Sequence, residues 1–151
     1  MIVRSHRRYD FAADRAGVWA AMSAIDEFRH WWPWLRRFDG QGLVVGDVWR
    51  CTVQPPLPYV MRFTVALDEI IEHSLVRATV GGDVTGTVRI ELADRAPGRA
   101  PGCEVQLVSA LTPDSGFVRA LTFVGRPLVK FGHDWVLDTG ARQFSAHAFD
   151  A

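Results

Sequence analysis

Up to about residue 112, apolar and polar positions alternate along the chain, the pattern of strands with one buried face. Residues 43–53 are expected to contain a turn at Val44-Val45-Gly46-Asp47, and we expect about seven strands in all. Short turns such as Gly81-Gly82-Asp83 predict an antiparallel sheet that is covered on one side only. The clearest alternation falls in the ranges 2–11, 48–53, 59–72, 75–81, 84–92 and 103–112.

Helical spacing appears in two other parts of the chain. Asp14 is a candidate N-cap for one short helix, and Asp26 for a second that Pro33 ends. Further on, a single helical stripe carries the residues Phe117, Leu121, Val124, Leu128, Phe131 and Trp135. The stripe predicts a C-terminal helix of about eight turns, which Pro127 is expected to kink and Gly140 could end early.

The order of these elements predicts an α+β fold: a strand, two short helices, further strands and a long helix. The length of 151 residues suits one domain over 1–151. A curved sheet with one apolar face needs another element packed against that face, and the long helix is the only element large enough. We expect more room between this helix and the sheet than the helical stripe fills.

Several short segments are similar to segments of one known superfamily. They are Ala16-Gly17-Val18-Trp19, Phe28 to Arg36 (FRHWWPWLR), Gly46-Asp47-Val48-Trp49-Arg50, Gly82-Asp83-Val84-Thr85-Gly86 and His133-Asp134-Trp135-Val136. The chain resembles the START and polyketide cyclase/dehydrase-like superfamily (SRPBCC), which includes the birch pollen allergen type, and within it the bacterial polyketide cyclase-like branch. The resemblance spans nearly the whole chain and implies a helix-grip fold. It implies no single function, because the superfamily holds carriers, cyclases, hydrolases and regulatory partners.

The segment His30-Trp31-Trp32-Pro33-Trp34 concentrates three of the six tryptophans at a bend. Large rigid side chains at such a place suit a wall against an apolar space. Trp32 shares a helical stripe with Phe28 and is interpreted as core that plugs the end of the sheet. Trp34 follows the break and is the better candidate for a pocket wall.

The inward faces supply the rest of the candidate cavity. The candidate lining residues are Trp34, Trp49, Tyr59, Met61, Phe63, Ala78, Gly86, Val88, Leu107, Ser109, Leu128, Phe131 and Trp135. Most of them are core whatever the function. The small residues Ala78, Gly86 and Ser109 remove volume from the middle of the sheet, which favours a cavity of about 300–1,000 Å³. Gly86 alternatively marks a β-bulge.

Few polar side chains are placed to orient a ligand. The candidates are Arg7, Tyr9, Tyr59, Asp134 and Asp138. An inward arginine needs a partner or a place at a rim. Asp134 lies beside the helical stripe and His133 behind it, so His133 is expected to be a surface or structural residue rather than a base. Asp138 and Arg142, one turn apart, could form a salt bridge where the helix leaves the core.

Other chemistries find little support in the sequence. The 17 basic and 17 acidic residues form no basic stripe, which argues against nucleic acid as a partner. The histidines are scattered and no zinc-binding spacing occurs, so neither a metal nor a cofactor is expected. Cys51 and Cys103 are expected to be buried free thiols. No nucleophile motif occurs, and the catalytic residues of any reaction stay unknown.

The leading hypothesis is a bacterial protein that binds a hydrophobic small molecule: a lipid, fatty acyl chain, isoprenoid or polyketide-like aromatic. We expect it in the cytoplasm as a monomer or homodimer, without stable membrane insertion, since no apolar run reaches the roughly 18 residues of a span. The alternative is a cyclase, aromatase or dehydratase, which a buried and unpaired titratable residue would favour. A third hypothesis is an interaction module with a vestigial cavity, which an exposed patch at Trp31 or Trp34 would favour.

Overall fold

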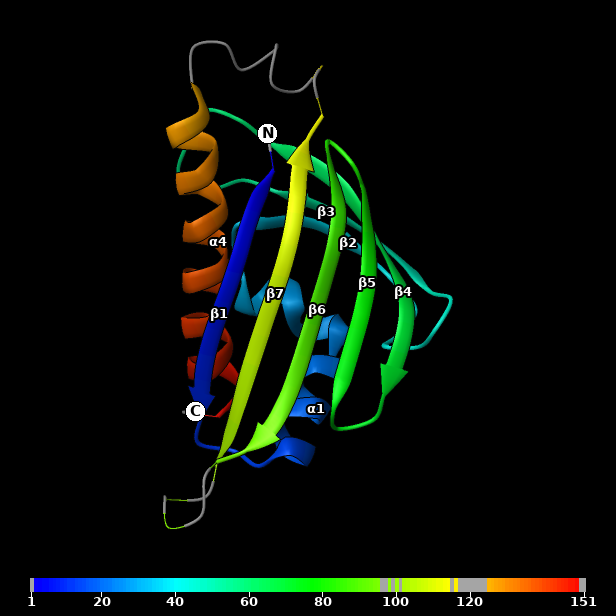
Figure 1. Cartoon of the computed structure of the whole chain (residues 1–151), viewed down its shortest axis with the longest axis vertical. Helices are drawn as coiled ribbons and strands as arrows, with labels where there is room; N and C mark the ends of the chain where they lie inside the picture. Colours follow the sequence, from blue (N-terminus) through cyan, green and yellow to red (C-terminus); the bar gives the residue numbers. More distant parts are fainter. Residues whose placement is uncertain are drawn as a thin grey trace.

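The chain forms one curved antiparallel sheet of seven strands in the order β1-β7-β6-β5-β4-β3-β2, with helix α4 packed beside β1 (Figure 1). The strands are β1 Val3–Phe11, β2 Leu35–Asp39, β3 Val48–Val53, β4 Met61–Ile71, β5 Leu75–Gly82, β6 Val84–Asp94 and β7 Cys103–Pro113. The computed structural model describes residues 2–95, 98, 100, 102–114, 116 and 125–149, with side chains from 130 onward in the last range. The predicted helix-grip architecture is confirmed.

The predicted alternation is confirmed on the central strands. In β5, Val76, Ala78 and Val80 are buried, while Arg77 and Thr79 between them are exposed. Because strand side chains alternate between the two faces of a sheet, this pattern places one apolar face toward the helix.

Gly86 has a different role from the one expected. It adopts φ +149°, and a Cβ at this position would overlap the carbonyl oxygen of Ala110 on β7. The ladder runs evenly through Gly86, which pairs with Val80 on β5 and Leu111 on β7, so no bulge forms there. Glycine is needed here for the close approach of β7 rather than to open space in the sheet.

The short helices after β1 follow the prediction in part. Helix α1 spans Arg15–Ser23, and the Asp14 carboxylate accepts a hydrogen bond of 2.8 Å from the Gly17 N–H, as expected of an N-cap. The second helix is a 3₁₀ turn, η1 Ile25–Glu27, continued by α2 Phe28–Trp31, and neither has a side-chain cap. Asp26 lies inside η1, so the prediction of a cap at Asp26 was wrong.

Strand β2 was not predicted from the sequence. Its five residues, LRRFD, contain one buried side chain, Leu35, and charged side chains that point to solvent. It pairs with β3, where Phe38 lies opposite Cys51. A short edge strand buries few of its side chains, so its alternation of apolar and polar residues is too weak to recognise in the sequence. The predicted turn at residues 44–47 does form, with a hydrogen bond from the Asp47 N–H to the Val44 carbonyl.

Helix α4 spans Gly125–Ala148 and runs past Gly140 without a break, so the alternative of an early end at Gly140 is excluded. Pro127 lies in its first turn, where a missing N–H costs little. The helix stays in the core beyond Asp138, because Phe144 is 7% exposed and packs edge-on against Phe11. The part of the predicted helix over residues 117–124 lies outside the described residues.

Candidate functional site

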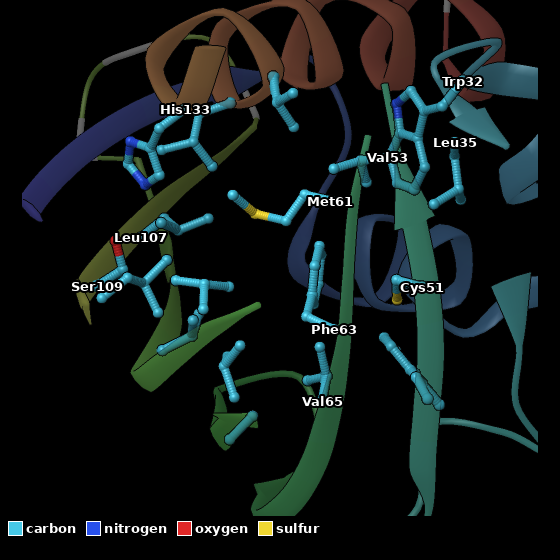
Figure 2. A pocket seen from close by; sticks show the side chains of 18 of the residues that line it. Trp32, Leu35, Cys51, Val53, Met61, Phe63, Val65, Leu107, Ser109 and His133 are labelled. Atoms are coloured by element: carbon cyan, nitrogen blue, oxygen red, sulfur yellow. The ribbon is translucent and has the colours of Figure 1, made fainter. Parts of the chain in front are cut away.

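A cavity of about 380 Å³ lies between the concave face of the sheet and helix α4 (Figure 2). Its walls are almost entirely apolar: Met61, Phe63 and Val65 of β4 line its middle, and the aromatic segment after α1 lines one side. Predicted residues that line it are Trp34, Trp49, Tyr59, Met61, Phe63, Ala78, Val88, Leu107 and Ser109. Alternation along the predicted strands was sufficient to find all of these positions except Trp34, which was identified from its place after the break at Pro33.

The aromatic side of the cavity is fixed to α4 by indole hydrogen bonds. Trp32 Nε1 donates to the Gly140 carbonyl at 2.9 Å, and Trp34 Nε1 donates to Gln143 Oε1 at 2.8 Å. The two rings stack with centroids 5.6 Å apart. Trp32 also packs on Phe28 at 4.8 Å, so it serves both as core and as cavity wall, and the expectation of a purely core role was incomplete.

Helix α4 turns a different face to the cavity than the sequence predicted. The residues that line the cavity are Gly132, His133, Val136, Leu137 and Phe144. Phe131 is 49% exposed, and neither it nor Trp135 lines the cavity, so both predictions were wrong. Gly86 does not line the cavity either. The side chain of Leu128 lies outside the described residues.

The reason for this helix orientation is the size of the side chains that meet α4 from the opposite side. A Cβ on Gly132 would overlap the Tyr59 hydroxyl, and one on Gly140 would lie 3.1 Å from the Trp34 ring. Bulky residues of the sheet and the aromatic segment therefore face the glycines of the helix. The largest apolar side chains of a helix do not identify its buried face when the partner surface is already bulky.

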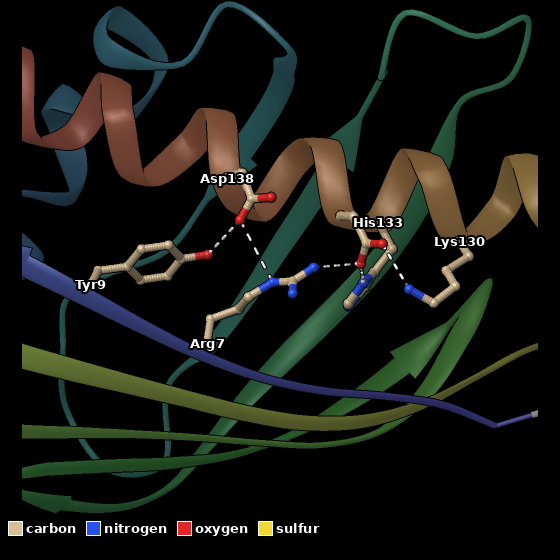
Figure 3. Close-up of polar contacts among 6 residues, drawn as sticks. Arg7, Tyr9, Lys130, His133 and Asp138 are labelled. Atoms are coloured by element: carbon tan, nitrogen blue, oxygen red, sulfur yellow. Dashed lines mark hydrogen bonds and ion pairs between the residues drawn. The ribbon is translucent and has the colours of Figure 1, made fainter.

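A charged network joins β1 to α4 outside the cavity (Figure 3). We call it the β1–α4 seam; its members are Arg7, Tyr9, Lys130, Asp134 and Asp138. Arg7 Nη2 lies 2.8 Å from Asp134 Oδ1, and Arg7 Nε lies 3.6 Å from Asp138 Oδ1. The Tyr9 hydroxyl donates to Asp138 at 3.1 Å, and Lys130 Nζ lies 2.8 Å from Asp134 Oδ2. None of these side chains lines the cavity, so among the predicted orienting residues only Tyr59 faces a ligand space.

Electrostatics within the seam follow from these contacts. Burial, together with the negative charge of Asp138, raises the pKa of Tyr9 to about 12. Burial acts to raise the pKa of Asp134, but hydrogen bonds from Lys130 and His133 outweigh it and the pKa is lowered. The predicted Asp138–Arg142 salt bridge does not form, since Arg142 donates to the Thr139 hydroxyl at 3.1 Å and Asp138 pairs with Arg7.

His133 was expected to be a surface or structural residue, and the structure places it in the cavity wall rather than on the surface. Its side chain is 17% exposed, and Nδ1 lies 3.3 Å from Asp134 Oδ1. Burial lowers the pKa of the ring despite the neighbouring carboxylate, so the imidazole is neutral at pH 7. The sequence singled out this residue but not its orientation, which depends on the rotation of α4 about its own axis.

Three further polar side chains line the cavity. Ser109 is 4% exposed, and its Oγ has no hydrogen-bond partner among the described residues. Tyr59 is 7% exposed, and burial raises the pKa of its hydroxyl. Burial also raises the pKa of the Cys51 thiol to about 12, which makes it a poor nucleophile. Cys51 and Cys103 are buried and free, as predicted.

Neither a metal site nor a membrane span is visible in the described part of the chain. No three His, Cys, Asp or Glu side chains there are grouped closely enough to hold a metal ion. None of the helices within it is both long and apolar enough to cross a membrane.

Comparison with known proteins places the fold but gives no close relative. No protein-family model matches the sequence, and no curated protein matches it significantly. Solved structures match over nearly the whole chain. A conserved protein from Geobacillus kaustophilus has a TM-score of 0.75 at 9% identity, covering 98% of this chain and 96% of that one.

Two further structures carry more informative names. A START superfamily protein from Mycobacterium smegmatis has a TM-score of 0.71 at 12% identity, with 97% of each chain covered. Truncated norcoclaurine synthase from Thalictrum flavum has a TM-score of 0.65 at 17% identity, covering 100% of this chain and 96% of that one. With such low identities the likeness shows the fold alone, and that fold is the helix-grip fold of START and birch-pollen-allergen-like proteins.

Proposed function

We propose that the protein binds a hydrophobic small molecule in the cavity between the sheet and α4. The observation that carries this proposal is the apolar cavity of about 380 Å³, a size within the roughly 300–1,000 Å³ of small-molecule sites. Binding would be driven by burial of apolar ligand surface, worth about 25 cal/mol per Å² before the costs of association. A lipid, fatty acyl chain, isoprenoid or polyketide-like aromatic suits such walls.

The proposal is tested by native mass spectrometry of the purified protein, followed by extraction of the same sample under denaturing conditions. We expect a retained mass that extracts as an apolar compound, or, for an empty protein, binding of fluorescent fatty acids or flavonoid-like aromatics. A protein that is empty and binds no member of such a panel would contradict the proposal.

A second candidate function, an enzyme of the polyketide cyclase, aromatase or dehydratase type, is favoured by His133. Its ring faces the cavity and is neutral at pH 7, and Asp134 holds Nδ1, which leaves Nε2 free to take a proton from a bound molecule. One protein of the same fold is named a synthase, norcoclaurine synthase. Deuterium exchange at carbon next to the carbonyl of a bound ketone, lost in His133→Gln, would support catalysis.

The third hypothesis, an interaction module, receives no support from the aromatic segment. Trp31 and Trp34 are half-buried, and the Trp31 ring packs edge-on against Phe144 at 5.7 Å. The cytoplasmic location and the monomeric or homodimeric state stay predictions from the sequence.

A further inference from the structure

The two sides of the cavity differ in the contacts that they offer to a ligand (Figure 2). On one side, Trp32 and Trp34 offer apolar ring atoms only, since their indole N–H groups already donate to oxygen atoms of α4 at 2.9 and 2.8 Å. On the opposite side lie Ser109 of β7 and His133 of α4. A polar group of a ligand would therefore find partners on one side of the cavity.

The Ser109 hydroxyl is a buried polar group without a partner. The residue is 4% exposed, and Oγ makes no hydrogen bond among the described residues. Leu107 and Leu111, its neighbours on the same face of β7, line the cavity with it. An unsatisfied buried hydroxyl destabilises the empty protein, and a ligand group that bonds this hydroxyl after a rotation about χ1 would remove that cost.

His133 supplies a second neutral polar group on the same side. Asp134 lies 3.3 Å from Nδ1, which leaves Nε2 for a ligand. The charge of Asp134 is balanced within the β1–α4 seam by Arg7 and Lys130, each at 2.8 Å. Because the ring is uncharged at pH 7 and its Nδ1 donates to the Asp134 carboxylate, Nε2 carries a lone pair and accepts a hydrogen bond from a ligand hydroxyl.

We propose that the ligand is an uncharged molecule with a single hydrogen-bonding group, a carbonyl or a hydroxyl that bonds Ser109, with a hydroxyl also donating to His133 Nε2, while its apolar body packs on Met61 and Phe63. This inference rests on the proposed function and names its ligand class. A carboxylate is disfavoured, because an ionised group in apolar surroundings needs a cation. The Arg7 guanidinium is engaged by two aspartates of the seam instead.

The test is calorimetric titration of the protein at pH 7 with four molecules that share one apolar body: naphthalene, naphthol, acetylnaphthalene and naphthoic acid. We expect naphthol and acetylnaphthalene to bind about tenfold more tightly than naphthoate, and more tightly than naphthalene. Ser109→Ala should weaken acetylnaphthalene about fivefold and leave naphthalene unchanged.

Ser5→Ala is the matched control. Ser5 lies opposite Ser109 in the β1–β7 ladder and its hydroxyl also lacks a partner, but it does not line the cavity. We expect the Ser5→Ala variant to bind all four molecules with the affinity of the wild type. His133→Leu should weaken naphthol, whose hydroxyl donates to Nε2, and leave acetylnaphthalene unchanged, which reports on the second polar group independently.

The outcomes separate this inference from the proposed function. If naphthalene binds as tightly as acetylnaphthalene and Ser109→Ala changes neither, the cavity binds ligands but the polar contact is wrong. Tighter binding of naphthoate than of acetylnaphthalene would also overturn the inference. If none of the four molecules binds, this inference is wrong; if the protein also retains no apolar compound in native mass spectrometry and binds no fluorescent fatty acid, the proposed function falls with it.

Discussion

Helix α4 is held to the rest of the protein in two different ways along its length. Around Gly132 and Gly140, rings of Tyr59, Trp32 and Trp34 pack against the helix, and two indole N–H groups donate to the Gly140 carbonyl and to the Gln143 side chain. In the β1–α4 seam, partly exposed side chains form ion pairs, with Arg7 31% and Asp134 29% exposed. Packed contacts of the first kind fix the position of a helix, whereas ion pairs at such exposure contribute little stability.

The largest expected effect comes from Gly132→Ala. Its new Cβ would overlap the Tyr59 hydroxyl, so we expect a loss of about 2–3 kcal/mol in the free energy of unfolding. This loss would exceed the gain of about 1 kcal/mol that alanine brings within a helix. Urea denaturation of both proteins measures the difference.

The matched control is Tyr59→Phe, alone and combined with Gly132→Ala. Without the hydroxyl, the nearest atom of the ring would be Cζ at 3.2 Å, so most of the destabilisation should disappear in the double variant. Equal effects of Gly132→Ala in both backgrounds would show that the hydroxyl does not set the position of α4.

Trp32→Phe should have the next largest effect. It removes the 2.9 Å hydrogen bond to the Gly140 carbonyl and part of the ring that stacks on Trp34. We expect a loss of about 1–2 kcal/mol in stability, measured by thermal or urea unfolding. A variant as stable as the wild type would mean that the indole bond contributes nothing net to holding the helix.

Asp134→Asn tests the seam and should cost less, about 1 kcal/mol, because the group is partly exposed to solvent. It removes the charge that Arg7 and Lys130 share. Because solvent-exposed ion pairs are screened, the difference from wild type should shrink at high salt. A loss comparable to that of Gly132→Ala would reverse the ranking of the two kinds of contact.

The pH dependence of stability gives the smallest predicted effect. His133 has a folded-state pKa below its unfolded value of about 6.5, so the unfolded chain binds more protons as the pH falls through that range. Stability is therefore lost below about pH 6.5, until the folded-state pKa is reached. His133→Gln should flatten this part of the profile, as measured by urea midpoints between pH 7 and pH 5. An unchanged slope would place the titrating group elsewhere.

The sequence predicted the buried faces of the strands but not that of the long helix, and the reason lies in what each element packs against. Alternation on β5 found its buried face because sheet side chains strictly alternate. The face of α4 could not be found that way: Phe131 is the larger side chain, yet Gly132 and His133 face the cavity, because bulky rings already fill the opposite side. The seam was missed for the same reason, since its pairs depend on the rotation of the helix.

The most direct test of the central claim, a ligand cavity under α4, compares two valine substitutions. Val136→Trp places a large ring in the cavity wall, and Val108→Trp places it on β7 at a position that is 42% exposed. With both variants folded by circular dichroism, calorimetric titration with acetylnaphthalene should show binding lost in Val136→Trp and retained in Val108→Trp. Equal binding by the two variants would contradict a cavity at this place.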